Sequence, residues 1–278
     1  MDRFPPGVDG RRPNIARVYD CFLGGNDNFH ADRELFARLL AVAPDAMRPA
    51  MDNRAFLQRV VRFLVTEAGV RQFIDIGSGL PTRGNIHQAV LEAGGQACVT
   101  YIDSDPAVIA HSRALLDGSS NATMILGDMR RPWQILDSPE VSKLLDSGQP
   151  VALTMLAVLH HINDDEDPAG VTAQLRRALP PGSYLAISHF RDVSSMMPNT
   201  AWSIATGEKI LHESLGSGVW RSYDEIREYF GNFELIDPGL VPLAEWRHAP
   251  GALCHHHIGH HSFIGGVARK VSAESDRT

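Results

Sequence analysis

The sequence predicts an α/β fold, a doubly wound and mostly parallel sheet of seven strands with an N-terminal helical cap. Two observations predict this class. Short, nearly continuous apolar segments alternate with helical segments along residues 72–188, the pattern of parallel strands buried on both faces. Three helical segments precede the first of these strands. With 278 residues, 44% of them apolar, the chain is long enough for one large domain of this kind.

The expected elements follow from hydrophobic periodicity and from the prolines and glycines that begin or end them. The seven strands are expected at residues 72–77, 97–103, 122–126, 150–156, 183–188, 233–236 and 262–268. Helices are expected at residues 13–22, 32–40, 51–67, 85–93, 106–116, within 133–145, at 167–179, around 200–214 and at 222–229. Pro44 and Pro49 are expected to end the second helix, and Gly69 the third.

This pattern divides the chain into four parts. Residues 1–12 are rich in proline, glycine and charge and are expected to be a mobile N-terminus. Residues 13–69 form the helical cap or lid, residues 70–270 the sheet domain, and residues 271–278 a C-terminal tail. Within the sheet domain, residues 191–221 form an insertion on the side where a substrate would bind.

Composition excludes several classes of function. The net charge of −7 argues against a nucleic-acid partner, because nucleic-acid-binding surfaces are usually basic. No apolar segment reaches the roughly 20 residues of a membrane span, and the first residues lack the apolar core of a signal peptide. Cys21, Cys98 and Cys254 are widely separated and fit neither a disulfide framework nor a metal site. We therefore expect a cytoplasmic protein without a membrane or nucleic-acid partner.

The strongest local signal for a ligand is the segment QFIDIGSGLPTRGN at residues 72–85. A buried strand containing Asp75 ends in Gly77-Ser78-Gly79 and turns directly into a helix. Glycines let a ligand approach the backbone closely, and the helix directs its unpaired N–H groups at that ligand. Ordinary strand-to-helix turns also use glycine, so this loop alone does not identify a ligand.

Acidic residues at successive strand ends strengthen the signal. In a doubly wound sheet, ligands bind outside the carboxyl ends of the strands. The second strand ends in Asp103-Ser104 and the third in Asp128-Met129. Asp103 can accept hydrogen bonds from ribose hydroxyls, and Asp128 from an amine. Each carboxylate alone is typical of a helix cap, but together with Asp75 and the glycine turn they favour a nucleoside cofactor.

Two nucleoside cofactors compete for this pattern. The dinucleotide fingerprint Gly-x-Gly-x-x-Gly requires a third glycine where this chain has Thr82, and this disfavours NAD(P). The loop and the two following acids together resemble the Rossmann-like class I S-adenosylmethionine-dependent methyltransferases. That class uses an acidic-x-Gly-x-Gly loop, an acid after the second strand and an Asp after the third. Pro81 departs from its usual loop, where a third glycine is common.

A resemblance to one family extends over almost the whole chain. The segments ARVYDCFLGGNDNFHADRE, FIDIGSGLPTRGNIHQ, YIDSDPAVIAHSRALL, GDMRRP and GGVARK resemble, in this order, the actinobacterial S-adenosyl methyltransferase family, long catalogued as a domain of unknown function. The resemblance implies a Rossmann-like methyltransferase sheet and S-adenosyl-L-methionine as cofactor. It implies no particular substrate.

Carried over position by position, the class pattern implies which residues contact the cofactor. It places the methionine part beside Gly77, Ser78 and Gly79 after Asp75, the ribose on Asp103, the adenine against Ser104, Asp128 and Met129, and the cofactor's amino group at the backbone near Leu156. The N-terminal segment is specific to the family. We interpret it as a lid, in which Tyr19 and the turn containing Gly24 and Gly25 fold over the site.

His160 and His161 follow the fourth strand, where substrate and methyl donor meet in this fold. A histidine there could accept the proton that a hydroxyl or ammonium acceptor must lose. The alternative is that one histidine packs inward and the other caps the loop. Both residues are candidate catalytic groups, and geometry must decide between these roles.

Two further clusters are interpreted as structural. Five histidines lie within residues 255–261 (HHHIGHH), but Gly259 and the following strand disfavour a helical metal pair. No acidic partner is evident, so we expect a solvated loop and no resident metal. The acidic run at residues 164–167 is expected to begin a helix, because carboxylates there complement the helix dipole.

The sequence leaves three functions open. The leading hypothesis is a methyltransferase acting on oxygen, nitrogen or carbon of a small molecule, with apolar insertion residues such as Met196, Met197, Trp202 and Trp220 suggesting a partly apolar substrate. The second is an S-adenosylmethionine-binding sensor or regulatory module without catalysis. An NAD(P)-dependent oxidoreductase is the third. The acceptor atom and the oligomeric state are left open.

Overall fold

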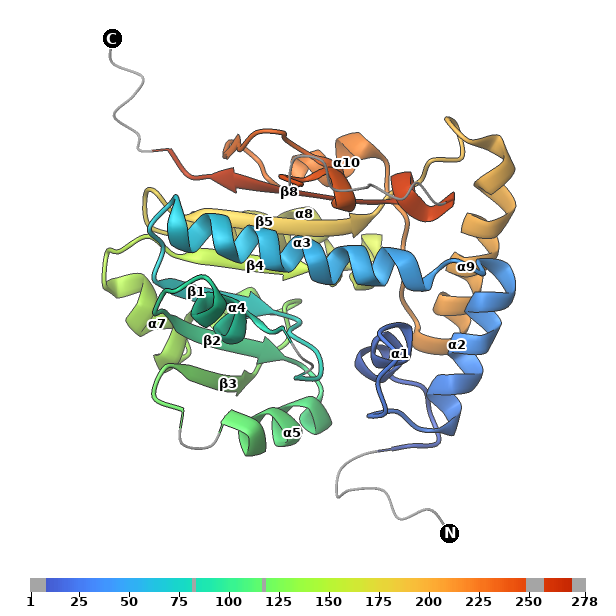
Figure 1. The fold of residues 1–278 in the computed structure, drawn as a ribbon, viewed down its shortest axis with the longest axis horizontal. Coiled ribbons are helices and arrows are strands. Elements are labelled where there is room, and N and C mark those ends of the chain that lie inside the picture. The colour runs from blue at the N-terminus through green and yellow to red at the C-terminus, as the bar shows by residue number, and fades with distance from the viewer. Residues whose placement is uncertain (1–8, 82–83, 117–118, 249–257, 272–278) are drawn as a thin grey trace.

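The computed structural model describes residues 9–81, 84–116, 119–248 and 258–271. Within these ranges eight strands form one sheet in the order β3-β2-β1-β4-β5-β8-β6, with β7 also paired to β8 (Figure 1). The strands are β1 (Gln72–Ile76), β2 (Cys98–Asp103), β3 (Ala122–Leu126), β4 (Ala152–Leu156), β5 (Tyr184–Phe190), β6 (Glu234–Leu235), β7 (Val241–Pro242) and β8 (Phe263–Arg269). Strands β1 to β5 pair in parallel, and β8 runs antiparallel to β5, β6 and β7.

The α-helices described are α1 (Ile15–Phe22), α2 (His30–Val42), α3 (Met47–Thr66), α4 (Ile86–Glu92), α5 (Pro106–Leu116), α6 (Pro132–Leu136), α7 (Pro139–Asp146), α8 (Pro168–Ala178), α9 (Ala201–Leu215) and α10 (Tyr223–Glu228). Short 3-10 turns add η1 (Leu159–His161), η2 (Asp164–Glu166), η3 (Pro198–Thr200), η4 (Leu243–Glu245) and η5 (Ile258–Ser262). None of the helices in the described ranges combines the length and apolar character that crossing a bilayer requires.

Alternate residues of each central strand pack on opposite faces of the sheet, as the strand period of two requires. In β1, Phe73 packs with apolar residues of α3, α4 and α5. Ile74 and Ile76 pack with residues of α7, α8 and α10 on the other face. Two buried cores, one on each face, therefore hold the sheet, which agrees with the predicted doubly wound architecture.

A third apolar cluster lies beyond the carboxyl ends of the parallel strands. Val18 of α1 and Leu35 of α2 pack there against Ile210 and Leu211 of α9. Figure 1 shows these three helices gathered at that edge, while α3 runs along the face of the sheet. Helix α3 therefore packs with the sheet, and α1 and α2 pack with the insertion that contains α9.

The N-terminal segment and the C-terminal tail predicted from composition lie mainly outside the described residues, at 1–8 and 272–278. The adjoining residues 9–12 contact the body of the protein. Arg17 donates from its guanidinium group to the backbone carbonyl of Arg12 at 2.8 Å, and its Nε pairs with buried Asp32 at 2.7 Å.

The structure corrects the predicted elements at three places. The sheet has eight described strands instead of seven, because the two-residue strand β7 was too short to be predicted. The helix expected within 133–145 is two helices, separated where Pro139 begins α7. Pro49 does not end a helix but lies in the first turn of α3, where the missing N–H of proline leaves no intrahelical bond unmade.

Candidate active site

A cavity of about 960 Å³ lies at the carboxyl ends of β1 to β4. The residues that follow these strands line one side of it, and residues of α1, α2 and α9 line the other. The cavity therefore joins the loops predicted to bind the cofactor and the helices predicted to cover them. The predicted site residues that line it are Tyr19, Asp75, Gly77, Ser78, Gly79, Asp103, Ser104, Asp128, Met129, Leu156, His160 and His161.

The glycine loop lies at the switch point of the sheet, between β1 and β4. Gly77 has a φ of +71°, and a Cβ atom there would lie 2.2 Å from Cγ2 of Val158. Gly79 has a φ of +66°, but no described heavy atom lies within 4 Å of its would-be Cβ. Gly77 is thus required by packing of the protein itself, whereas Gly79 borders open space that a ligand can occupy.

The acids at the strand ends hold the backbone of the loops. Asp103 accepts hydrogen bonds from the N–H groups of Gly79 and Asp105, each at 2.9 Å. Burial raises the pKa of Asp103. Asp128 accepts from the backbone N–H of Arg130 at 3.0 Å and from its guanidinium at 3.2 Å. Since a carboxylate offers about four acceptor positions, both side chains retain capacity for donors of a ligand.

One contact, between the cap of α1 and the loop after β2, was not predicted from the sequence. Asn14 caps α1 by accepting from the N–H of Ala16 at 2.9 Å. Its side-chain amide also donates to Asp105 at 2.6 Å. An asparagine before an apolar helical segment signals a cap, but nothing local signals a partner far along the chain. This bond ties α1 to the loop that follows β2.

Tyr19 belongs to a hydrogen-bonded chain that crosses the cavity wall. The Asn53 side-chain amide donates to the Tyr19 hydroxyl at 2.9 Å, and the Ser188 hydroxyl donates to the Asn53 carbonyl oxygen at 2.7 Å. The backbone N–H of Ala157 then donates to the Ser188 hydroxyl at 2.9 Å. The chain connects α1, α3 and β5 to the loop after β4, where Ala157 has a positive φ of 57°.

Gly24 and Gly25 are not among the described residues that line the cavity. Their turn wraps around Asp20, whose carboxylate accepts from the N–H of Asp27 and the amide of Asn28, each at 2.9 Å. A Cβ on Gly25 would lie 1.9 Å from Oδ1 of Asp20. The structure thus places the two glycines in a turn that packs on Asp20 of α1.

Asp75 is buried at the base of the cavity on the face of α3. The hydroxyl of Thr154 donates to its Oδ1 at 2.5 Å. Burial raises the pKa of Asp75 to about 7, while Thr154 and the positive charge of Arg54 act in the opposite direction. This carboxyl group therefore changes its protonation near neutral pH.

The two predicted histidines lie on the 3-10 turn η1. The ring of His189 on β5 packs edge-on against that of His160. The His160 ring is stacked on Phe190, with centroids 3.8 Å apart, and its buried Nδ1 finds no hydrogen-bond partner among the residues that the structure describes. Nδ1 of His161 lies 2.9 Å from the Ser217 hydroxyl. Burial is the main cause that lowers the pKa of His160 well below its usual range, that of His161 to about 4 and that of His189 to about 3. All three rings are therefore neutral at pH 7.

The other end of the cavity is largely apolar. The Phe190 ring is stacked between His160 and Trp220, with 4.5 Å between the Phe190 and Trp220 centroids. Of the four apolar insertion residues singled out from the sequence, Trp220 lines the cavity, whereas Met196 and Trp202 are exposed. Further apolar lining residues are Phe22, Leu39, Val42, Val193, Ile204 and Leu211.

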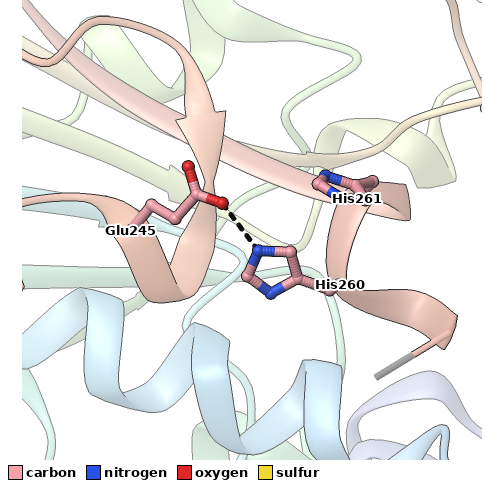
Figure 2. Close-up of side chains that lie close together, drawn as sticks. All are labelled: Glu245, His260 and His261. Carbon is pink, nitrogen blue, oxygen red and sulfur yellow. Dashed lines mark hydrogen bonds and ion pairs between the residues drawn. The ribbon is translucent and has the colours of Figure 1, made fainter. Parts of the chain in front are cut away.

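The histidine-rich segment differs from the solvated loop that we expected. Residues 255–257 and Cys254 lie outside the described residues. His260 and His261 lie on the 3-10 turn η5, and the His260 side chain is buried. Nε2 of His260 lies 2.7 Å from Oε1 of Glu245 (Figure 2). The expectation was wrong for His260 because its acidic partner comes from another turn of the chain.

The acidic residues at 164–167 form separate contacts, as expected for a helix start instead of a metal cluster. Asp167 caps α8 by accepting from the N–H of Gly170 at 2.9 Å. Asp164 pairs with buried Arg221 at 2.7 Å. Glu166, the second of these acids with a charged partner, pairs with Arg130 at 2.6 Å.

Comparison with known proteins adds the following findings. A family model for S-adenosyl methyltransferases matches residues 2–271. A candidate methyltransferase from Thermobifida fusca is 39% identical, with a TM-score of 0.89 over 96% of this chain and 98% of that chain. A DUF574 family protein from Streptomyces avermitilis is 32% identical, with a TM-score of 0.85 over 94% of this chain and 99% of that chain. An O-methyltransferase family protein from Burkholderia thailandensis, at 14% identity and a TM-score of 0.52, covers 84% of this chain and 63% of that chain and shares the fold. None of the curated proteins compared with the chain matches it.

Proposed function

Because the chain belongs to the S-adenosyl methyltransferase family and so uses S-adenosylmethionine, we propose that it methylates a small, largely apolar molecule in the cavity between the sheet and helices α1, α2 and α9. The observation that carries the proposal is the continuity of this cavity, which runs from the strand-end acids to an apolar aromatic end. The family match also favours this hypothesis over a nicotinamide oxidoreductase.

The residues at the strand ends fit the cofactor. Its ribose hydroxyls and adenine amine are hydrogen-bond donors, and Asp103 and Asp128 supply acceptors that line the cavity. Open space beside Gly79 lets the methionine part approach the backbone of the loop. In this proposal, Gly77, Ser78 and Gly79 hold the methionine part. The ribose lies on Asp103, the adenine lies against Ser104, Asp128 and Met129, and the amino group faces Leu156.

S-adenosylmethionine supplies an electrophilic methyl group on a positively charged sulfur, and its transfer requires an acceptor aligned with the breaking bond. The chain contributes alignment and exclusion of water. Helix α1 is held over the cavity through Asn14, whose partner Asp105 lies on the loop after β2, and through Tyr19, whose partner Asn53 lies on α3. These contacts favour a closed, dry site in which electrostatic interactions are stronger than in water.

The apolar end of the cavity indicates the class of substrate. Phe190 and Trp220 are stacked there with 16° between their planes, and such surfaces favour a flat or apolar molecule. His160 covers the other face of Phe190, and its buried Nδ1 has no hydrogen-bond partner among the described residues. We assign it the role of accepting a hydrogen bond from the acceptor hydroxyl or amine of the substrate.

The low pKa of His160 limits that role. A neutral imidazole can accept a hydrogen bond throughout the neutral range, but a weakly basic one takes the proton less completely. His160 therefore orients and polarises the acceptor group, and the acceptor's proton passes to water after the methyl group has been transferred. His161, whose Nδ1 already faces Ser217, supports the turn that carries His160.

A labelling experiment tests this function. The full chain is incubated with S-adenosylmethionine labelled in the methyl group and a fractionated extract of small apolar metabolites. We expect label to enter an extract-derived small molecule, with less transfer by a His160→Phe variant that binds the cofactor normally. Cofactor binding without transfer to any fraction would instead support the sensor hypothesis, and label confined to macromolecules would contradict a small substrate.

We also propose a cytoplasmic location. Cys21 and Cys98, both within the described residues, are free thiols, which fits a reducing compartment. Fractionation of cells that produce the protein tests this, and recovery in the secreted fraction would contradict it.

A further inference from the structure

A group of metal-ligating side chains lies in the part of the fold where β7 and β8 meet. Glu245 of η4 and His260 and His261 of η5 place one possible ligand atom each within 4.8 Å of one another. Figure 2 shows the Glu245 carboxylate directed at the His260 ring, with the His261 ring beside them. None of the three residues lines the cavity of the proposed methyl transfer.

The fold brings these residues together through strand pairing. In the antiparallel pairing of β7 and β8, Pro242 is opposite Ile264. Glu245 follows Pro242 by three positions and His261 precedes Ile264 by three, so the two continue across from each other beyond the paired segment. The pairing of β7 with β8 therefore brings residues that are distant in the sequence close together, and the ligands need not share a helix.

The turn that carries Glu245 is held firmly. The guanidinium of Arg59 on α3 donates to the carbonyl oxygens of Leu243 at 2.6 Å and Trp246 at 2.7 Å, on either side of Glu245. Trp246 is fully buried and packs edge-on against Phe56, with 5.4 Å between ring centroids. A rigid support of this kind is what orients a ligand before a metal arrives.

The turn that carries the histidines is held as well. Ser262 closes η5 by donating from its hydroxyl to the carbonyl of Gly259 at 2.9 Å. The rings of His260 and His261 are nearly perpendicular, at 82°. His260 is buried, while the Glu245 side chain is 40% exposed. The group of ligands is therefore closed to solvent at His260 and open to solvent at Glu245. Solvent exposure on that side gives an ion a path to the ligands.

From this geometry we propose that Glu245, His260 and His261 form a site for Zn²⁺. Two imidazoles and one carboxylate are a donor set that suits zinc, with water completing four-coordination. In a tetrahedral zinc site neighbouring ligand atoms lie about 3.3 Å apart, so rotations of the side chains suffice to gather the three. Zinc binding would replace the Glu245–His260 hydrogen bond by two bonds to the metal.

The position of the site indicates a structural role. Gly259 and Ser262, on the same turn as the two histidines, line the cavity, as does Phe263 at the start of β8. A metal that joins η4 to η5 therefore braces one wall of the cavity. Ion binding to the folded state alone raises the thermal midpoint, because it shifts the unfolding equilibrium by mass action.

The test is a zinc titration of the full chain purified without an affinity tag. We expect one Zn²⁺ per chain and a higher thermal midpoint with zinc. Loss of a supporting outer-shell group already costs about 10- to 100-fold in metal affinity, so Glu245→Gln and His260→Gln should each cost at least that much. Circular dichroism of both variants checks that they remain folded.

A triple variant provides the matched control. Substitution of His255, His256 and His257 by glutamine removes the neighbouring histidines of the sequence and should leave zinc binding unchanged. The proposal is overturned if the wild-type chain binds no zinc in the micromolar range. It is also overturned if the triple variant loses binding while Glu245→Gln retains it. If His260→Gln fails to fold, Glu245→Gln still tests the site, because Glu245 is exposed and its substitution disturbs the fold less.

Discussion

At the scale of single residues, the two glycines of the first loop have different tasks. Gly77 and Gly79 share a positive φ, but only the would-be Cβ of Gly77 meets Val158. A side chain at Gly77 therefore strains the fold, whereas one at Gly79 extends into space that we assign to the cofactor. The same sequence motif thus combines a requirement of packing with a requirement of binding.

Paired substitutions separate the two tasks. Gly77→Ala should lower the free energy of unfolding by about 2–4 kcal/mol, because left-handed strain adds to a steric clash. Gly79→Ala should cost about 1–2 kcal/mol from strain alone and weaken S-adenosylmethionine binding. Urea unfolding and calorimetric titration measure the two effects. Equal loss of stability in both variants would contradict the assignment.

The pH profile of methyl transfer tests His160. Because its pKa is well below 6.5, the ring stays neutral between pH 6 and 8, and its contribution should not change across that window. His160→Phe, which removes the ring nitrogens, should lower kcat by about 5- to 10-fold, the cost of one lost hydrogen bond, with little change in cofactor affinity. A rise in activity that follows an ordinary histidine pKa near 6.5 would contradict a buried neutral ring.

At the scale of elements, helix α1 is joined to the cofactor loops by a few polar contacts. Asn14 serves both as the helix cap and as a partner of Asp105. The two roles can be separated, since serine is also a good cap but does not reach as far. The proposed closure of the site depends on the second role.

We predict that Asn14→Ser lowers the free energy of unfolding of the unliganded chain by about 1–1.5 kcal/mol, because the helix cap is kept and one hydrogen bond to Asp105 is lost. Because α1 is then held less firmly over the cavity, S-adenosylmethionine binding should weaken by up to about tenfold. Calorimetry and stopped-flow dissociation provide the measurement. Unchanged affinity and dissociation rate would show that α1 does not close over the cofactor.

Local sequence signals predicted the central elements and failed where partners are distant. Strands β1 to β5 are nearly continuous apolar segments and were predicted within a few residues. Strand β7 has two residues, one of them proline, and carries no periodic signal. The bonds from Asn14 to Asp105 and from His260 to Glu245 depend on the folded topology, so no local pattern could predict them.

At the scale of the whole molecule, the buried acid Asp75 links stability to pH. Its pKa is about 7 in the folded chain against an ordinary value of 3.8. Between these values the folded state retains a proton that the unfolded state has released. The contribution of Asp75 to the free energy of unfolding therefore falls as pH rises from 4 to 7 and is constant above that.

Asp75→Asn should remove this dependence. We compare the free energy of unfolding of the variant with that of wild type, both without ligand. The difference, variant minus wild type, should be about 2–4 kcal/mol larger at pH 8 than at pH 5. Urea unfolding of both proteins at the two pH values gives the comparison. Subtracting the wild-type change also removes the opposite effect of the buried histidines, which is shared by both proteins. Parallel pH profiles would contradict a raised pKa at Asp75.

One continuous cavity joins the strand-end residues to helices α1, α2 and α9. Strand-end acids, the loop glycines and the helices above them form one space, and the family identifies the methyl donor that it uses. Most of the cofactor residues that the resemblance implied do line that space. Gly24 and Gly25 instead hold the turn after α1. The substrate class rests on the aromatic end, which the fold assembles from β5 and the insertion.

The most direct test of the site is a calorimetric titration of S-adenosylmethionine into wild type, Asp103→Asn and the exposed control Asp165→Asn. We predict micromolar binding by wild type and control, with at least about tenfold weaker binding by Asp103→Asn, since a hydrogen bond to a charged group contributes about 1.5–3 kcal/mol. Absence of binding by wild type, or equal binding by Asp103→Asn, would contradict the account.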